Sequence, residues 1–258
     1  MGMLTETYIH IPGVSIRAEK TIHAGGVCDW NRFLEAPPRL HPRLCNIVRN
    51  ALPESLSALR AKDISFFSSR LPPAEHWRLL KDFSYSSACL DIETTGCSPY
   101  NSKITVVGVF ANGRYYAFTS DSDVETAAEF LSRFAILVTY NGKRFDVPFL
   151  VHKLGWRFLD DMVQVDIMYL CRRLGLKGGL KGVELGLGIE RPAEVRGLDG
   201  YDAVQLYHRY LQGERDAFDK LIEYNRCDVE NLLRVFEAVY PALRLGVIGG
   251  GIQNRASR

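Results

Sequence analysis

The chain has 258 residues, of which 47% are hydrophobic and 24% are charged, and these values exclude a mostly disordered or collagen-like polypeptide. Its 32 Lys and Arg residues nearly balance its 30 Asp and Glu residues, so the net charge of +2 argues neither for nor against a nucleic-acid partner. No apolar run reaches the roughly 20 residues of a membrane span, and the first residues lack the basic and then apolar stretch of a secretory signal.

Residues 1–85 are predicted to form a small all-α region, because short helical patterns alternate with prolines there. A serine-rich stretch around residues 82–87 then indicates a domain boundary. This amino-terminal region holds 11 Lys and Arg residues against 8 Asp and Glu residues, so it carries a modest basic excess.

Within this region, residues 11–27 begin with the letters IPGVS and continue with a helical pattern. The segment resembles a helix-hairpin-helix motif, in which a glycine-containing hairpin presents backbone N–H groups to a DNA phosphate. Ser15 stands where the motif usually has a second glycine, and a side chain there restricts the hairpin. Two interpretations stay open, namely contact with DNA and a purely structural lid or docking role.

The first β-type runs appear after residue 86. Three strands are predicted at residues 87–92, 103–110 and 114–119, and Asn112-Gly113 joins the last two, a strong hairpin pattern. The remaining predicted elements are a helix that starts at residues 121–123, a strand at 135–139, a helix at 145–154, a strand at 163–165, and helices at 167–174, 179–187, 201–210 and about 216–239.

This order of elements predicts an α/β fold. We expect a mixed sheet of three antiparallel strands followed by parallel strands, flanked by helices, since the hairpin excludes an all-parallel sheet. The α/β domain should occupy residues 86–240. The Gly-rich residues 241–258 are predicted to form a flexible tail.

Two acidic residues end the first predicted strand, in the sequence Asp91-Ile92-Glu93. Because side chains alternate along a strand, both carboxylates point to one face, and Leu90 and Ile92 point into the core. Neighbouring carboxylates repel each other, and a bound cation removes that cost. Taken alone, the pattern also fits an ordinary polar strand end.

Two further acids stand out later in the chain. Asp146 opens a helix after the fourth predicted strand and its Asn-Gly turn, where the helix dipole favours an acid. Asp228 lies four residues after Tyr224, on the same face of the long carboxy-terminal helix. Aspartate is a poor residue inside a helix, so its position needs a reason. A solvent-facing acid remains the ordinary explanation for Asp228 alone.

The three motifs DIETTG, YNGKRFD and YNRCD, in this order, resemble those of the DEDD exonuclease superfamily. The tyrosine of the third motif resembles the DEDDy branch, and the first two motifs resemble the proofreading domains of family B DNA polymerases. The spacing and the segment after the second motif are most similar to stand-alone YprB-like proteins with an RNase H fold. The resemblance covers residues 86–240.

The resemblance implies a metal-dependent 3′–5′ exonuclease that releases 5′-mononucleotides with the help of two divalent ions, Mg²⁺ or Mn²⁺. By this resemblance, Asp91 bridges both ions, Glu93 and Asp228 complete one site, and Asp146 acts at the other through water. Tyr224 is implied to orient the attacking water, because a tyrosine of ordinary pKa is a poor general base at neutral pH. A tyrosine that merely packs on its helix is the alternative.

Polar and basic residues near these motifs are candidates for holding the nucleic acid. They are Thr94 and Asn141 for the terminal nucleotide, and Lys143, Arg144, Lys177 and Lys181 for the phosphates. The last two lysines lie beside glycines, where backbone N–H groups also reach a phosphate. Solvated surface charge is an equally good explanation for each basic residue.

The six cysteines contain no C-x-x-C pair, which predicts reduced thiols and a cytoplasmic protein. We expect single-stranded or frayed nucleic acid as the partner, with DNA favoured over RNA, and no membrane. The alternative function is an RNase H-like adaptor that binds nucleic acid or protein without catalysis.

Overall fold

The computed structural model describes residues 2–119 and 123–249, and the chain divides into two compact units. The first unit comprises Met1–Ser84 together with Tyr240–Arg258, and the second comprises Tyr85–Val239. The division after Ser84 falls inside the serine-rich stretch of the sequence. Within the described residues, no helix has both the length and the apolar character needed to cross a bilayer.

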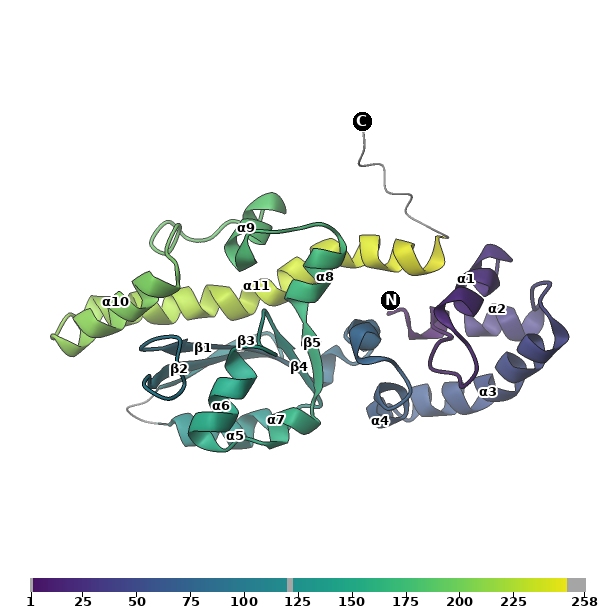
Figure 1. The fold of residues 1–258 in the computed structure, drawn as a ribbon, viewed down its shortest axis with the longest axis horizontal. Coiled ribbons are helices and arrows are strands. Elements are labelled where there is room, and N and C mark those ends of the chain that lie inside the picture. Colours follow the sequence, from purple (N-terminus) through teal and green to yellow (C-terminus); the bar gives the residue numbers. More distant parts are fainter. Residues whose placement is uncertain (1, 120–122, 250–258) are drawn as a thin grey trace. The chain divides into compact units, whose positions relative to one another are not determined.

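The first unit is built from helices, and among the described residues it contains, besides residues 240–248 of a long carboxy-terminal helix, six helices from its amino-terminal part (Figure 1). They are the 3-10 helix η1 (Leu4–Glu6), α1 (Ile16–Ala24), α2 (Trp30–Glu35), α3 (Pro42–Arg60), α4 (Ile64–Ser68) and the 3-10 helix η2 (Pro73–Leu79). Large aromatic side chains from two of these helices, α2 and α4, contribute to its core, since Trp30, Phe33 and Phe67 are fully buried. Burial of such side chains is the main source of stability for short helices.

The turn before α1 differs from the predicted helix-hairpin-helix. Gly13 adopts a left-handed backbone (φ +88°), as a hairpin glycine does. Ser15, however, has φ −84°, and its Oγ accepts a hydrogen bond from the N–H of Ala18 at 3.1 Å. It therefore caps α1 without steric strain, contrary to the restriction predicted from the sequence. Residues 2–15 contain η1 but no α-helix, so the first helix of the motif is absent there.

A buried histidine lies in the core of the first unit. His10 is 1% exposed, its Nε2 lies 2.9 Å from the Oγ of Ser55, and its ring centroid lies 5.3 Å from that of Trp30. Burial, reinforced by the positive charges of Arg70 and Arg78, lowers the pKa of His10 to about 3. The folded chain therefore holds a neutral imidazole.

We expect His10 to weaken folding as the pH falls from about 6.5 towards 3. The unfolded chain takes up a proton at the ordinary pKa and the folded chain does not, so stability is fully present above that pKa and is lost below it by up to about 1.4 kcal/mol per pH unit. Urea unfolding at pH 7 and pH 5, followed by tryptophan fluorescence, measures this loss. In His10→Asn the difference in unfolding free energy between the two pH values should shrink by about 2 kcal/mol. An unchanged difference would contradict a buried neutral imidazole.

The second unit combines a sheet with helices on both faces (Figure 1). Its elements are η3 (Ser84–Ser86), β1 (Ser87–Thr94), β2 (Ile104–Ala111), β3 (Arg114–Thr119), α5 (Val124–Leu131), β4 (Ile136–Thr139), α6 (Asp146–Leu154), α7 (Phe158–Asp161), β5 (Val163–Asp166), α8 (Ile167–Arg173), α9 (Gly179–Gly186), α10 (Gly200–Leu211) and α11 (Arg215–Ile248).

The strands form one five-stranded sheet in the order β3-β2-β1-β4-β5. The pairs β1–β2 and β2–β3 are antiparallel, whereas β1–β4 and β4–β5 are parallel, which confirms the predicted mixed sheet. Asn112 and Gly113, with φ of 52° and 75°, form the predicted turn between β2 and β3. Strand β1 thus lies at the centre of the sheet, with the edge strands two positions away.

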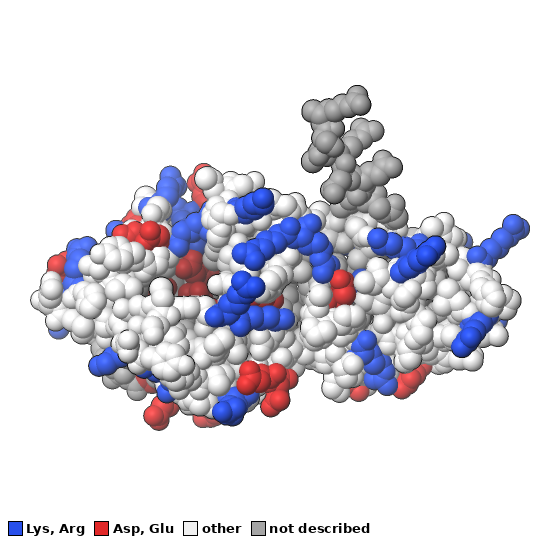
Figure 2. Space-filling model, viewed as in Figure 1, with Lys and Arg blue, Asp and Glu red and all other residues white. Residues whose placement is uncertain are grey.

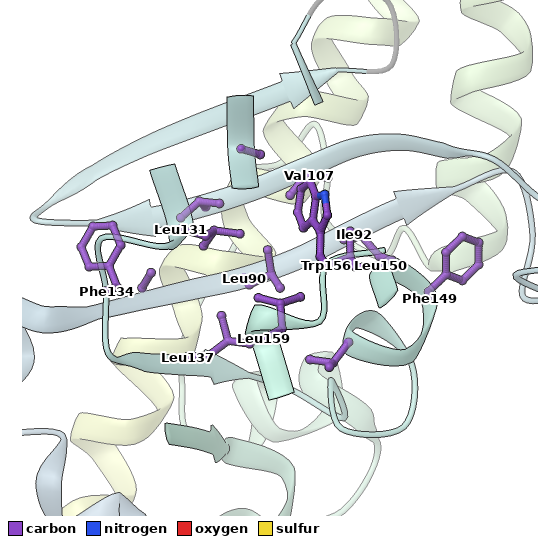
Figure 3. Packing of buried hydrophobic residues seen from close by; sticks show 14 of the residues in the cluster. Leu90, Ile92, Val107, Leu131, Phe134, Leu137, Phe149, Leu150, Trp156 and Leu159 are labelled. Carbon is purple, nitrogen blue, oxygen red and sulfur yellow. The ribbon is translucent and has the colours of Figure 1, made fainter. Parts of the chain in front are cut away.

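Alternation along β1 separates the core from the polar site. Leu90 and Ile92 join a buried cluster on the face of the sheet covered by α5, α6 and α7, where they meet Phe149 and Trp156 (Figure 3). The opposite face is covered by α10 and α11, which bury a second cluster that includes Leu221. Asp91 and Glu93 point to this second face, towards α11.

Two predicted boundaries are corrected. Helix α11 continues to Ile248, so the predicted helix end at residue 239 and the predicted flexible tail are wrong for residues 241–248. The reason is burial, because Tyr240, Leu243 and Val247 follow each other at helical spacing on a buried face. Residues 250–258 lie outside the described residues, as does Asp121 in the predicted helix start, and α5 begins at Val124.

Candidate active site

Three of the predicted acids meet between β1 and α11. Asp91, Glu93 and Asp228 each offer one carboxylate oxygen, and these atoms all lie within 4.8 Å of one another. Asp91 is half-buried, and the other two are each 7% exposed. The strand presents its two acids on one face, and the helix adds the third across from them. The result is a compact cluster of hard oxygen ligands.

This cluster is electrostatically costly without a cation. Burial, and next the charge of Asp228, raise the pKa values of Asp91 and Glu93 well above their usual range. Burial also raises the pKa of Asp228, despite the attraction of Arg191 and Lys181. Arg191 and Lys181 only partly balance the negative charge of these hard carboxylate donors, which are the ligands that a divalent ion such as Mg²⁺ prefers. The donor set therefore fits such an ion.

Asp146 opens α6 beside the cluster but is not one of its three members. Its Oδ1 accepts a hydrogen bond from the N–H of Ile92 at 3.0 Å, between the two acids of β1. Burial raises the pKa of Asp146 to about 7, and the charges of Asp166 and Asp228 add to this effect. Its carboxylate is thus held against the backbone of the central strand, next to the other acids.

Tyr224 lies one turn before Asp228 on α11 and is 3% exposed. The Nζ of Lys181 donates a hydrogen bond to its Oη, and this ammonium lies 4.4 Å from the centroid of the ring. Burial, followed by the charge of Asp228, raises the pKa of Tyr224 further above its ordinary value. The phenol therefore keeps its proton at neutral pH, which argues against a role as general base.

Asn225 belongs to this site, although the motifs did not reveal it. Its Nδ2 donates to Asp91 Oδ2 at 3.0 Å and to Glu93 Oε1 at 3.3 Å. Its Oδ1 accepts a hydrogen bond from the hydroxyl of Tyr115 at 2.9 Å. The side chain is fully buried. One amide thus orients both acids of β1, and Tyr115 fixes the direction in which the amide faces.

Gly108 provides the room for Asn225. It pairs with Asp91 across β1 and β2, and a Cβ at this position would lie 1.7 Å from the Oδ1 of Asn225. A glycine inside a strand indicates a close approach by another group, and this is the feature by which the sequence could have revealed the contact. The β1–β2 register also shifts between Glu93 and Thr94, a bulge next to the acids.

Arg191 is a second residue that the motifs missed. Its guanidinium donates two hydrogen bonds of 2.7 Å to Glu184 and a further one to Asp228 Oδ1. Asn231 donates to Glu184 Oε1 at 3.0 Å, so the glutamate, which is no predicted ligand, is held from two sides. All four side chains are buried. In the described part of the chain, Arg191 Nη1 has no hydrogen-bond partner. No sequence pattern connects these residues.

The acids open onto a cleft of about 200 Å³ in the second unit. Asp91, Glu93, Tyr224 and Asp228 line it, together with Phe145 and the turn after β1. Figure 2 shows acidic side chains at the bottom of a hollow in this unit, with Lys and Arg side chains on the surrounding surface. The cleft therefore brings the acidic centre within reach of an external molecule.

The six residues predicted to hold nucleic acid occupy different settings. Thr94 lines the cleft, where its Oγ1 donates to the carbonyl of Gly96 at 2.7 Å. Asn141 adopts a left-handed backbone (φ 65°), and its N–H donates to Asp166 Oδ1 at 2.8 Å. Asparagine is favoured in this conformation, so turn geometry explains it. Lys181 contacts Tyr224.

The other three predicted contacts are surface residues. Lys143, Arg144 and Lys177 are exposed, and none of them lines the cleft. The backbone N–H of Lys143 points to Asp166 Oδ2 at 3.4 Å, which ties the turn before α6 to the end of β5. Their contact with nucleic acid stays a prediction.

A mixed five-stranded sheet, with acids of its central strand facing a long helix, defines the class of the second unit as an α/β domain with an acidic centre. The family model described as RNase_H superfamily matches residues 88–240. The chain belongs to this superfamily, and its RNase H-like fold is confirmed. No curated protein matches the chain.

Solved structures with a similar arrangement come from different organisms. A family B DNA polymerase from the archaeon Pyrobaculum calidifontis is similar over 64% of this chain and 26% of its own, with 17% identity and a TM-score of 0.52. Brucella melitensis NrnC matches 66% of this chain and 79% of its own, with 16% identity and a TM-score of 0.44. The chain thus spans about a quarter of the polymerase, and that likeness shows a shared fold.

Proposed function

We propose that this chain is a metal-dependent 3′–5′ exonuclease. It hydrolyses phosphodiester bonds of single-stranded or frayed nucleic acid, DNA in preference to RNA, and releases 5′-mononucleotides. The observation that carries the proposal is the convergence of carboxylate oxygens from Asp91, Glu93 and Asp228 within 4.8 Å at the end of the central strand. Membership of the RNase H superfamily supports the same conclusion.

The metal site we propose consists of Asp91, Glu93 and Asp228, with Asp146 acting beside them through water. Two Mg²⁺ or Mn²⁺ ions would balance the four negative charges of these residues. When bound, such ions activate a water molecule and stabilise the charge that develops on the phosphate and the leaving oxygen. The chain's own contribution is to hold the carboxylates in place, through the amide of Asn225 and the N–H of Ile92.

Tyr224 is proposed to orient the attacking water. The Nζ of Lys181 donates to its Oη, which leaves the phenol hydrogen free to donate in turn. Because the pKa of Tyr224 is raised, that hydrogen is present throughout the neutral range. The tyrosine therefore positions a reactant, and proton removal falls to other groups.

Tyr224→Phe should lower kcat about tenfold and leave KM unchanged, since a hydrogen bond of about 1.4 kcal/mol is lost. Between pH 7 and 9, the rate of the unaltered enzyme should show no dependence on ionisation of this phenol. Steady-state kinetics on a labelled oligonucleotide measure both quantities. Tyr100→Phe, at an exposed tyrosine, is the control. A loss above about 10³-fold, with a changed pH profile, would indicate a general base instead.

Digestion of 5′-labelled single-stranded DNA and RNA of one sequence, in parallel, tests the function. We expect products that shorten from the 3′ end, faster on DNA, with activity lost in EDTA and restored by Mg²⁺ or Mn²⁺. Full activity in EDTA contradicts the metal requirement. Immediate release of the 5′-labelled mononucleotide contradicts the 3′–5′ direction, because it means digestion from the 5′ end. Binding without turnover in either metal would support the non-catalytic adaptor.

The location and the sugar preference are also proposals. All six cysteines are free thiols, which supports a reducing compartment, and we propose the cytoplasm. The preference for DNA is proposed from the resemblance of residues 11–27 to a helix-hairpin-helix motif, of which the turn at Gly13 and helix α1 are present and the first helix is absent. Parallel digestion of the two nucleic acids decides this point.

A further inference from the structure

A second cavity, of about 390 Å³, lies in the second unit. It is formed by α9 and by residues 188–197 that follow this helix. Its lining includes Lys181, Glu184, Leu185, Ile189, Arg191 and Arg196. Apart from Lys181, no residue of this lining was a predicted contact, and the proposed reaction does not use the cavity.

Two side chains of its lining also reach the catalytic cleft. Lys181 donates a hydrogen bond to Tyr224, and Arg191 donates one to Asp228. Tyr224 and Asp228 both line the cleft of the acids. The two cavities are therefore neighbours, separated by the Lys181–Tyr224 and Arg191–Asp228 pairs.

The cavity combines an apolar surface with positive charge. Leu185 is 82% exposed, although it is a large apolar residue, and Ile189 is half-buried beside it. Arg196 pairs with Glu190 only loosely, at 3.7 Å, and its side chain is 64% exposed. Such a combination fits a nucleotide, because a base packs on apolar side chains and its phosphate binds to cations.

Two acids in the lining, Glu184 and Glu190, do not outweigh its three cations. Both carboxylate oxygens of Glu184 are occupied, by the guanidinium of Arg191 and by the amide of Asn231. Arg191 keeps one buried nitrogen, Nη1, without a partner in the described part of the chain. Lys181, Arg191 and Arg196 together outnumber Glu184 and Glu190, so the lining keeps one net positive charge, which complements a phosphodiester.

We infer that this cavity binds the nucleotide on the leaving side of the scissile bond, that is, the penultimate nucleotide of a 3′ end. Its base packs against Leu185 and Ile189, and its phosphate binds Lys181 and Arg196. The inference rests on the proposed exonuclease function. In this arrangement, α9 and residues 188–197 hold the nucleic-acid strand while the acids act on its last phosphodiester.

Comparing two substrates distinguishes a loss of binding in this subsite from a loss of catalysis at the acids. The first is a single-stranded oligonucleotide, and the second is the p-nitrophenyl ester of thymidine 5′-monophosphate, in which p-nitrophenol replaces the penultimate nucleotide. Leu185→Ser and Arg196→Gln should each raise KM for the oligonucleotide about tenfold. Both variants should hydrolyse the ester at the unaltered rate. Leu211→Ser, at a leucine that is 62% exposed and lines neither cavity, is the matched control.

Salt dependence gives a second measurement. Binding of a fluorescent oligonucleotide in Ca²⁺ should weaken in both variants, and Arg196→Gln should reduce the slope of log affinity against log salt by about 1. An unchanged oligonucleotide KM in both variants overturns the subsite. An equal loss on both substrates also overturns it, because it places these side chains at the reacting phosphate. If the unaltered chain cleaves neither substrate, the proposed function fails, and the binding measurement alone decides whether the cavity holds nucleotides.

Discussion

Asp228→Asn is expected to lower the rate of 3′-end hydrolysis by at least about 10³-fold, while the second unit stays folded. The substitution keeps the shape of the side chain but removes one of the three charged oxygens that meet within 4.8 Å. Loss of a metal ligand at a phosphoryl-transfer centre costs several kcal/mol of transition-state stabilisation, and about 4 kcal/mol corresponds to three decades in rate. The same result is expected for Asp91→Asn.

Single-turnover digestion in Mg²⁺ measures the rate, and calorimetric titration with Mn²⁺ measures metal affinity independently of activity. Asp219→Asn is the matched control, because it makes the same change at an exposed position on the same helix. Circular dichroism checks that each variant is folded. Undiminished Mn²⁺ binding together with an undiminished rate in Asp228→Asn would refute the proposed metal site.

Gly108→Ala is expected to lower the rate about 10²-fold through a residue that touches neither metal nor substrate. The added Cβ would lie 1.7 Å from the Oδ1 of Asn225, so the amide must move and release Asp91 and Glu93. Changes to groups that orient metal ligands cost roughly 10-fold to 100-fold in activity or metal affinity. Metal affinity should fall together with the rate. Gly246→Ala, at a helical glycine with open space around it, is the control.

A double-mutant cycle tests this explanation. Asn225→Ala should by itself cause a loss similar to that of Gly108→Ala. If Gly108 acts by making room for the amide, the combined variant should lose no more than Asn225→Ala alone. Additive losses would show that the glycine acts in another way, such as through pairing of β1 with β2.

Local periodicity was sufficient for the parts of the site that lie within one element. Alternation along β1 placed Asp91 and Glu93 on one face, and four-residue spacing placed Tyr224 and Asp228 on one face of α11. The hairpin at Asn112 likewise predicted the antiparallel pairing of β2 with β3. Each of these inferences depends on backbone geometry that the sequence carries within a few residues.

Contacts between residues far apart in the sequence could not be predicted from local periodicity. Arg191 reaches Asp228 across 37 residues of sequence, and Asn225 reaches Asp91 across 134. Neither contact follows from a period or a spacing, because each depends on how loops and helices pack on the sheet. The same holds for the end of α11, where burial of Leu243 and Val247 extends the helix past Pro241.

The alternation of β1 also limits how the sequence of this chain can change during evolution. Insertion or deletion of one residue between Ser87 and Asp91 would turn Leu90 and Ile92 towards α11 and drive both acids into the apolar core. Divergence in length among related chains should therefore be absent from β1. It should concentrate in surface loops that do not contact the acids, such as residues 98–101 between β1 and β2.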